Sequence, residues 1–151
     1  VYKRQVPGYA GGKTKTTTYK EVVTGTTGHA EVAKIEYDSS IITFEQILNV
    51  FWQAHDPTTL NRQGNDVGTQ YRSVIFYHNN KQKSLALESI KKAEASGYWS
   101  NKIVTEVTEL FNYSDAEGYH NNYYDNNPNQ PYCLFVIKPK LDKLEKKGII
   151  K

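Results

Sequence analysis

The chain has 151 residues, a formal net charge of +3 and 38% hydrophobic residues, which is typical of one soluble globular domain with a modest core. No apolar run approaches the roughly 18 residues that a membrane-spanning helix needs. The lysines are scattered, which argues against a nucleic-acid-binding surface. A single cysteine, Cys133, excludes an internal disulfide and is typical of a reducing compartment.

The sequence contains no methionine, even at position 1. We therefore expect that the chain does not begin at a native start. Residues 1–5 show neither a strand, a helix cap nor a signal pattern, and we interpret them as a non-native junction. The glycine-rich residues 6–14 that follow are interpreted as a loop. They imitate a phosphate-binding loop poorly, because proline stands at position 7 where such a loop needs its first glycine.

Residues 31–37 alternate in polarity and predict a strand. Glu31 falls in line with Ala33 and Ile35 on the more apolar face, so we expect its carboxyl to point inward. Burial would raise the pKa of that carboxyl and let it act as a general acid near neutral pH. The alternative is a strand-end glutamate that bends out to water.

The clearest helix is predicted over residues 43–54, where apolar residues recur at helical spacing behind a Thr43–Gln46 capping box. A polar loop over 58–73 follows and carries an acid, Asp66, and a phenol, Tyr71, near its end. The remaining patterns predict strands over 71–77, 103–110 and 133–137, and helices over 80–96 and 139–147. Helices alternating with a few strands favour two-layer α/β packing.

The side chains argue against most catalytic classes. The four histidines lack metal-site spacing, and no nucleophile elbow is present for a serine triad. A Cys133–His120 nucleophile pair stays open, although Cys133 begins an apolar run where a small buried thiol is the default. There remain two phenols and two acids that would suit the binding and protonation of a polar oxygen, namely Tyr19, Glu31, Asp66 and Tyr71.

Five segments together resemble the methionine sulfoxide reductase A family. They are Gly-Tyr-Ala-Gly-Gly at 8–12, Thr-Gly-His-Ala-Glu-Val at 27–32, His-Asp-Pro-Thr-Thr at 55–59, Arg-Gln-Gly-Asn-Asp-Val-Gly-Thr-Gln-Tyr-Arg-Ser at 62–73 and Tyr-His-Asn-Asn-Tyr at 119–123. The long segment at 62–73 is the most specific. The resemblance covers residues 6–151 and implies one reductase domain with an α+β fold. That fold is a two-layer α/β sandwich with a mixed sheet and a ferredoxin-like core.

The resemblance implies an enzyme of protein repair under oxidative stress that reduces methionine-S-sulfoxide, free or in proteins, to methionine. A cysteine thiolate attacks the sulfur, and thioredoxin restores the enzyme from outside, without a bound cofactor or metal. Carried over by motif, Glu31 resembles the acid that protonates the sulfoxide oxygen. Tyr19 and Tyr71 resemble the phenols that bind this oxygen, and Asp66 resembles the carboxylate that orders the polar side of the pocket. The resemblance also implies a cytoplasmic monomer that binds neither nucleic acid nor membrane.

One departure from the family pattern is large. The Gly-Cys-Phe-Trp-Gly motif that carries the family's nucleophile is absent, and with it the first strand and helix of the family fold. We therefore expect these 151 residues to be inactive as a reductase and marginally stable, with an unpaired sheet edge. Cys133 is interpreted either as a resolving cysteine or as a structural thiol.

Two rival interpretations follow from the same departure. The chain could be a non-catalytic module that binds methionine sulfoxide without reducing it. It could also be a cysteine hydrolase that uses Cys133 and His120.

Overall fold

The structure, a computed structural model that describes residues 2–149, begins with strand β1 (Tyr2–Ala10). β1 pairs antiparallel with β2 (Ala30–Tyr37), and Tyr9 lies opposite Glu31. The interpretation of residues 1–5 as lacking a strand is therefore wrong for residues 2–5, because pairing with a distant partner decides strand formation more than local composition does. Residue 1 of the predicted junction lies outside the described residues. The strand predicted over 31–37 is confirmed.

Parallel and antiparallel pairs lie in separate small sheets among residues 2–149. β7 (Ser114–Asp115) pairs with the other edge of β1, which gives the order β2-β1-β7. β5 (Val74–Tyr77) and β6 (Glu106–Glu109) form a parallel pair. The fold thus has the mixed α and β content that the sequence predicts, while its strands do not join into one mixed sheet.

Two predicted strands are shorter in the structure. The strand expected over 71–77 begins at Val74, because Tyr71 closes a 3₁₀ turn, η1 (Thr69–Tyr71). The strand expected over 103–110 is confined to β6. Before β5 the Arg72 N–H donates to Thr69 O within the turn, and before β6 the Val104 N–H donates to Pro57 O outside any strand pair, so hydrophobic alternation does not mark where these strands begin.

Helix α2 (Phe44–Ala54) confirms the clearest prediction. Its N-cap, Thr43, accepts a hydrogen bond from the Gln46 backbone N–H at 3.2 Å, and the Thr43 backbone N–H donates to Gln46 Oε1 at 2.8 Å. These two bonds satisfy groups that every helix N-terminus leaves without a helical partner. The capping box therefore defines where the helix begins.

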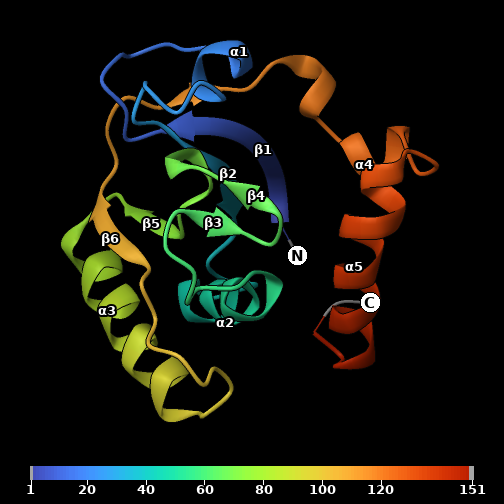
Figure 1. The fold of residues 1–151 in the computed structure, drawn as a ribbon. Coiled ribbons are helices and arrows are strands. Elements are labelled where there is room, and N and C mark those ends of the chain that lie inside the picture. Colours follow the sequence, from blue (N-terminus) through green and yellow to red (C-terminus); the bar gives the residue numbers. More distant parts are fainter. Residues whose placement is uncertain (1, 150–151) are drawn as a thin grey trace. The chain divides into compact units, whose positions relative to one another are not determined.

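A second helix, α3 (Asn80–Ala95), packs against α2 and against the β5–β6 pair. Figure 1 shows α3 running beside these strands. The core of this region comes from α2, β5, α3 and the segment before β6, and it consists of Leu48, Trp52, Ile75, Ala86 and Ile103. Burial of these apolar side chains is the main favourable contribution to the stability of the region.

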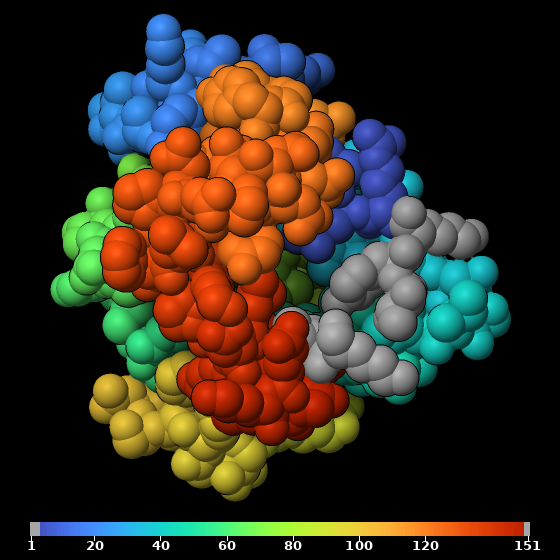
Figure 2. Space-filling view, turned by 90° about the vertical axis from the view of Figure 1, so that its right-hand side faces the viewer, coloured from blue at the N-terminus to red at the C-terminus, as the bar shows by residue number. Residues whose placement is uncertain are grey.

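The chain divides into two compact units, Val1–Ala116 and Glu117–Lys151, where the sequence predicted one domain. The second unit is entirely helical in its regular elements. They are η2 (Gly118–His120), α4 (Tyr123–Asn126), η3 (Cys133–Ile137) and α5 (Lys138–Lys146). Figure 2 shows this unit in orange to red.

The strand predicted over 133–137 is wrong, because Cys133–Ile137 forms a π-helical turn that continues into α5. A strand needs a neighbouring strand to satisfy its N–H and C=O groups, whereas a helix satisfies them within the segment. The β-branched residues Val136 and Ile137 favoured the strand prediction by propensity alone. Among the described residues, no helix is both long enough and apolar enough to cross a bilayer.

The capping box yields a stability prediction. We expect Thr43→Ala to lower the free energy of unfolding by about 1 kcal/mol, because the first turn of α2 loses its side-chain acceptor. Thr43→Ser keeps a hydroxyl at the same place and should cost well under half as much. Urea denaturation followed by circular dichroism checks both variants. Equal losses in the two variants would contradict the capping role.

Candidate active site

Four acidic or phenolic side chains converge in the first unit from four different elements. Tyr19 begins helix α1 (Tyr19–Val22), and Glu31 is the second residue of β2. Asp66 opens the short strand β4, and Tyr71 ends η1. The negative charge of Asp66 raises the pKa of Glu31, and Glu31, Tyr19 and Asp66 each raise the pKa of Tyr71. The four groups that the sequence singled out are therefore close enough to influence one another.

Glu31 has a pKa above its usual range, first because of burial and second because of the Asp66 charge. The reason predicted for this shift is wrong in part. Glu31 and Ala33 both keep accessible surface on their face of β2, so this face is not packed into a core. The carboxyl is instead surrounded by protein atoms while one side stays open. A carboxyl in this position loses hydration and still remains reachable by a solute.

Tyr71 also has a raised pKa, first because of burial and then because of its three acidic neighbours. The phenol therefore stays neutral and can donate a hydrogen bond at neutral pH. A side-chain hydrogen bond from Gln70 acts in the opposite direction and lowers this pKa. Gln70 is buried, with 5% of its surface exposed, so its hydrogen bond reaches the Tyr71 phenol from the protein interior.

Gln70 is a residue that the sequence interpretation missed. Its amide lies against Gly68, where an added Cβ would come within 2.3 Å of Gln70 Oε1. Within the described residues, this oxygen has no hydrogen-bond partner. The sequence position of Gln70 could have revealed this role. Gln70 directly precedes Tyr71, follows Gly68 by two residues, and lies within the most specific motif, residues 62–73.

The loop that carries Asp66 and Tyr71 is ordered by its own backbone. Strands β3 (Arg62–Gln63) and β4 (Asp66–Val67) form a short antiparallel hairpin. The Gly68 N–H donates to Asn61 O at 2.9 Å and closes the loop behind the hairpin. The predicted polar connector is therefore a rigid platform, which suits a segment that must hold an acid and a phenol in place.

Arg72 fastens this platform to the neighbouring strand. Its Nε donates to Glu106 Oε2 at 3.1 Å, and its Nη1 donates to Thr69 O at 3.0 Å. The Arg72 side chain is 17% exposed, so this ion pair is partly screened from water. One guanidinium thus links η1 to β6 and limits the freedom of the adjacent Tyr71.

The glycine-rich turn after β1 packs against a buried histidine. Any Cβ at Gly12 would come within 2.0 Å of the His29 ring, so only glycine fits there. His29 is 1% exposed, its Nε2 lies 3.0 Å from Thr14 O, and burial lowers its pKa. The turn that imitates a phosphate-binding loop therefore has a packing role, because it holds His29, which lies two residues before Glu31 and directly before β2.

A chain of hydrogen bonds supports the far side of the platform. His55 Nδ1 lies 2.7 Å from Phe51 O, and His55 Nε2 lies 2.7 Å from Ser73 Oγ. Ser73 Oγ in turn lies 2.7 Å from Thr105 Oγ1. This serine–histidine pair resembles part of a hydrolase triad, but Ser73 is only 7% exposed. Its position fits a link between the end of α2 and the β5–β6 pair.

The two residues of the hydrolase hypothesis both lie in the second unit. Cys133 is fully buried in η3. His120 Nε2 lies 3.7 Å from Glu117 Oε2, and its ring packs on Tyr119. A thiol without accessible surface cannot attack a substrate in this conformation, so the structure does not favour Cys133 as a hydrolytic nucleophile.

Two of the four convergent groups, Glu31 and Tyr71, can act as proton or hydrogen-bond donors. Glu31 holds its proton to higher pH than an ordinary glutamate, and Tyr71 is a neutral donor. Neither an acid nor a phenol of this kind is a strong nucleophile at neutral pH. Within residues 2–149, no three histidine, cysteine or acidic residues are arranged to hold a metal ion.

The fold and the site together define a class of protein, namely one with mixed α and β elements and a site whose side chains can donate protons. The sequence model of one family, described as peptide methionine sulfoxide reductase, matches residues 2–151. A peptide methionine sulfoxide reductase MsrA of Trichodesmium erythraeum is 55% identical over 139 residues, which cover 92% of this chain and 78% of the relative. One of Leptospira borgpetersenii is 54% identical over 143 residues, 95% of this chain and 80% of the relative. The chain belongs to the peptide methionine sulfoxide reductase family.

Solved structures agree with this membership. Reduced Mxr1 from Saccharomyces cerevisiae aligns with a TM-score of 0.79 and 37% identity, covering 85% of this chain and 74% of that chain. Methionine sulfoxide reductase A of Corynebacterium diphtheriae aligns with a TM-score of 0.74 and 37% identity, covering 84% of this chain and 65% of that chain.

The hydrogen-bonded link behind the platform yields a second stability prediction. Ser73→Ala leaves His55 and Thr105 without their shared partner in a buried place, so we expect a loss of about 1–3 kcal/mol in the free energy of unfolding. Ser84→Ala, at an exposed position of α3, should change it by less than about 0.5 kcal/mol. Chemical denaturation of both variants measures the difference. A loss at Ser73 no larger than at Ser84 would show that the link is energetically unimportant.

The raised pKa of Glu31 yields a pH prediction. Because the folded-state pKa lies above the unfolded one, the contribution of Glu31 to stability is fully present below the usual value of 4.5 and is lost as pH rises through the folded pKa. We therefore expect Glu31→Gln to stabilise the fold at pH 7 relative to the parent chain, and to bring no such gain at pH 4. Denaturation at both pH values tests this.

Glu36→Gln, at an exposed position of the same strand, controls for the change in net charge. The gain between pH 4 and pH 7 should be larger for Glu31→Gln than for this control. A gain independent of pH would mean that the burial of Glu31 carries no ionisation cost.

Proposed function

We propose that this chain forms the oxygen-binding, proton-donating side of an enzyme that reduces methionine-S-sulfoxide, free or in proteins, to methionine. The observation that carries the proposal is that Glu31, Tyr19 and Asp66 all lie close enough to Tyr71 to raise its pKa, and that burial and the Asp66 charge raise the pKa of Glu31. Relatives named peptide methionine sulfoxide reductase support the substrate class. The chemistry also fits, since a sulfoxide oxygen is a strong hydrogen-bond acceptor that must gain a proton before it can leave the sulfur.

In this proposal Glu31 is the general acid. Its raised pKa keeps a proton on the carboxyl closer to neutral pH, and the carboxyl transfers this proton to the sulfoxide oxygen as the sulfur–oxygen bond breaks. Tyr19 and Tyr71 donate hydrogen bonds to the same oxygen. Asp66 has a different part, because its charge raises the pKa of Glu31 and so keeps the acid protonated.

The reaction also needs a nucleophile. A thiolate attacks the sulfoxide sulfur, the oxygen passes to that thiol as a sulfenic acid, and methionine leaves. The one cysteine of the 151 residues, Cys133, is fully buried. We therefore propose that the attacking thiol is supplied from outside these residues and that the 151-residue chain alone does not turn over.

The reducing equivalents in this proposal come from thioredoxin, so that no bound cofactor takes part. The burial of Cys133 favours a structural thiol over a resolving cysteine. We also propose a cytoplasmic monomer. For the fold, we propose that the β2-β1-β7 and β5-β6 sheets are parts of one ferredoxin-like two-layer sandwich, which the similarity to solved reductases supports.

A second candidate function is a non-catalytic module that binds methionine sulfoxide. It is favoured by one observation, namely that the four interacting side chains of the first unit, Glu31, Asp66, Tyr19 and Tyr71, are two acids and two phenols, none of which can attack the sulfur as a thiolate does. Such a site would hold the oxygen and leave the sulfur unreduced. Binding that persists without turnover, even when a thiol-bearing segment is added at the N-terminus, would favour the binding module over the reductase.

The proposal is tested with a chain extended at its N-terminus by the preceding segment of the Trichodesmium erythraeum relative. Turnover of methionine-S-sulfoxide is measured with a dithiol reductant. We expect no turnover by the 151 residues alone, turnover by the extended chain, and a kcat about 10²–10⁴-fold lower after Glu31→Gln, because the general acid is lost.

Tyr71→Phe should lower kcat by about 10–10³-fold, since one donor to the developing charge is removed. The R epimer of the sulfoxide is the control substrate and should not turn over. Full activity of the extended Glu31→Gln chain would contradict the role of Glu31. Titration calorimetry with methionine sulfoxide on the 151-residue chain tests the binding module.

A further inference from the structure

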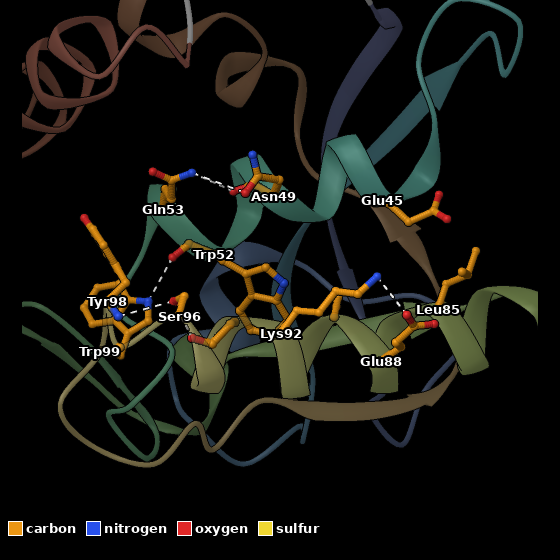
Figure 3. A pocket seen from close by; sticks show the side chains of 13 residues that line it. Glu45, Asn49, Trp52, Gln53, Leu85, Glu88, Lys92, Ser96, Tyr98 and Trp99 are labelled. Atoms are coloured by element: carbon orange, nitrogen blue, oxygen red, sulfur yellow. Dashed lines mark hydrogen bonds and ion pairs between the residues drawn. The ribbon is translucent and has the colours of Figure 1, made fainter.

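A cavity with a volume of about 450 Å³ lies between α2 and α3. It lies apart from the reductase site, since none of Tyr19, Glu31, Asp66 and Tyr71 lines it. Figure 3 shows side chains from both helices and from the segment after α3 surrounding it. A concave space of this size suits a small organic molecule or a short stretch of peptide.

An unused hydrogen-bond donor lines this cavity. The Trp52 side chain is 6% exposed, and in the part of the chain that the structure describes its indole Nε1 has no acceptor. The other tryptophan differs, because Trp99 Nε1 donates to Trp52 O at 3.1 Å. Buried N–H groups in native proteins almost always have a partner. The Trp52 N–H therefore indicates a place where a ligand can supply an acceptor oxygen.

A flexible side chain lines the same cavity as Trp52. Lys92 lines the cavity, and Figure 3 shows it extending from α3 toward Glu88. Its Nζ lies 2.7 Å from Glu88 Oε1, and both side chains are mostly exposed, at 69% and 56%. Exposed pairs of this kind contribute little to stability, so Lys92 can swing aside at small cost.

The charges around the cavity select against an anion. Glu45 and Glu88 each carry a negative charge, and Lys92 carries the one positive charge among the lining residues. Lys92 is already engaged with Glu88. An acceptor that also brings a negative charge would meet a net negative lining, whereas a neutral carbonyl oxygen would accept from Trp52 without repulsion.

The side chains that line the cavity favour a ligand with an apolar group. Leu85 and Ala93 line the space from α3, and Tyr98 and Trp99 line it from beyond the helix. The two aromatic rings meet edge to face, with centroids 5.0 Å apart and planes at 83°. An aromatic or branched apolar group can pack against such a pair.

We propose that this cavity is a binding site for an uncharged amide that carries an aromatic or branched apolar group, with the amide oxygen accepting a hydrogen bond from Trp52 Nε1. A capped amino acid and an apolar residue within an unfolded peptide share this chemistry. This proposal does not depend on the proposed function, because the cavity shares no residue with the candidate active site.

The indole N–H groups report on this site directly, because Trp52 and Trp99 are the only tryptophans of the chain and both line the cavity. The protein is labelled with ¹⁵N and titrated with N-acetyl-L-phenylalaninamide, and the two indole N–H signals are followed by NMR. We expect a saturable downfield shift of the Trp52 signal. The anion N-acetyl-L-phenylalanine should bind at least about tenfold more weakly, because the lining is net negative.

Ser89 and Ser84 provide matched variants on the same helix. Ser89 lines the cavity and Ser84 does not, so Ser89→Leu should weaken binding at least about tenfold by filling space, and Ser84→Leu should leave it unchanged. Lys92→Ala should strengthen binding by opening the way to Trp52. Circular dichroism of each variant confirms that it is folded.

The probe Ac-Ala-Phe-Ala-NH₂ distinguishes the two sources of the amide. Tighter binding than the single capped residue supports a peptide, and weaker binding supports a small molecule. The proposal is overturned if neither probe shifts the Trp52 signal saturably, or if Ser89→Leu and Ser84→Leu behave alike.

Discussion

The candidate active site depends on one electrostatic constraint, which is that Glu31 and Asp66 lie close together while Glu31 is partly withdrawn from water. Burial raises the pKa of Glu31 and the Asp66 charge raises it further, so the carboxyl retains its proton to higher pH than an ordinary glutamate. Tyr71 is under the same influence and stays neutral. The chemistry proposed for the site, donation to an oxygen, follows from these raised pKa values rather than from any single reactive residue.

Keeping acidic groups together costs stability, and the surrounding structure offsets this cost. The β1–β2 register places Glu31, the β3–β4 hairpin places Asp66, and Arg72 ties the turn that carries Tyr71 to β6. The capped helix α2 contributes Leu48 and Trp52 to the core of the first unit. Helices α2 and α3 also line the cavity that contains Trp52. The packing between these two helices therefore stabilises the unit and leaves room for a ligand.

Local pattern predicted α2, α3 and β2 well, because each has a period or a cap that a short window displays. It failed for β1, whose paired residues lie 20 to 35 positions further along the chain, from Ala10↔Ala30 to Tyr2↔Tyr37, and for Cys133–Ile137, where β-branched residues turned out to be helical. At the site, motif resemblance singled out the acids and phenols that the fold brings together. Gln70 and His29 were missed because their roles depend on burial and on contacts with glycines.

The sequence by itself determined the family, the helix boundaries set by caps, and the identity of the groups able to donate to an oxygen. These depend on residue types and short spacings, which a linear chain displays directly. Only the tertiary structure decided that Glu31 loses hydration on a face that stays open, that Cys133 is buried, and that Trp52 holds an N–H without an acceptor. Hydration and hydrogen-bond satisfaction depend on everything that surrounds a group, and residues distant in sequence supply those surroundings.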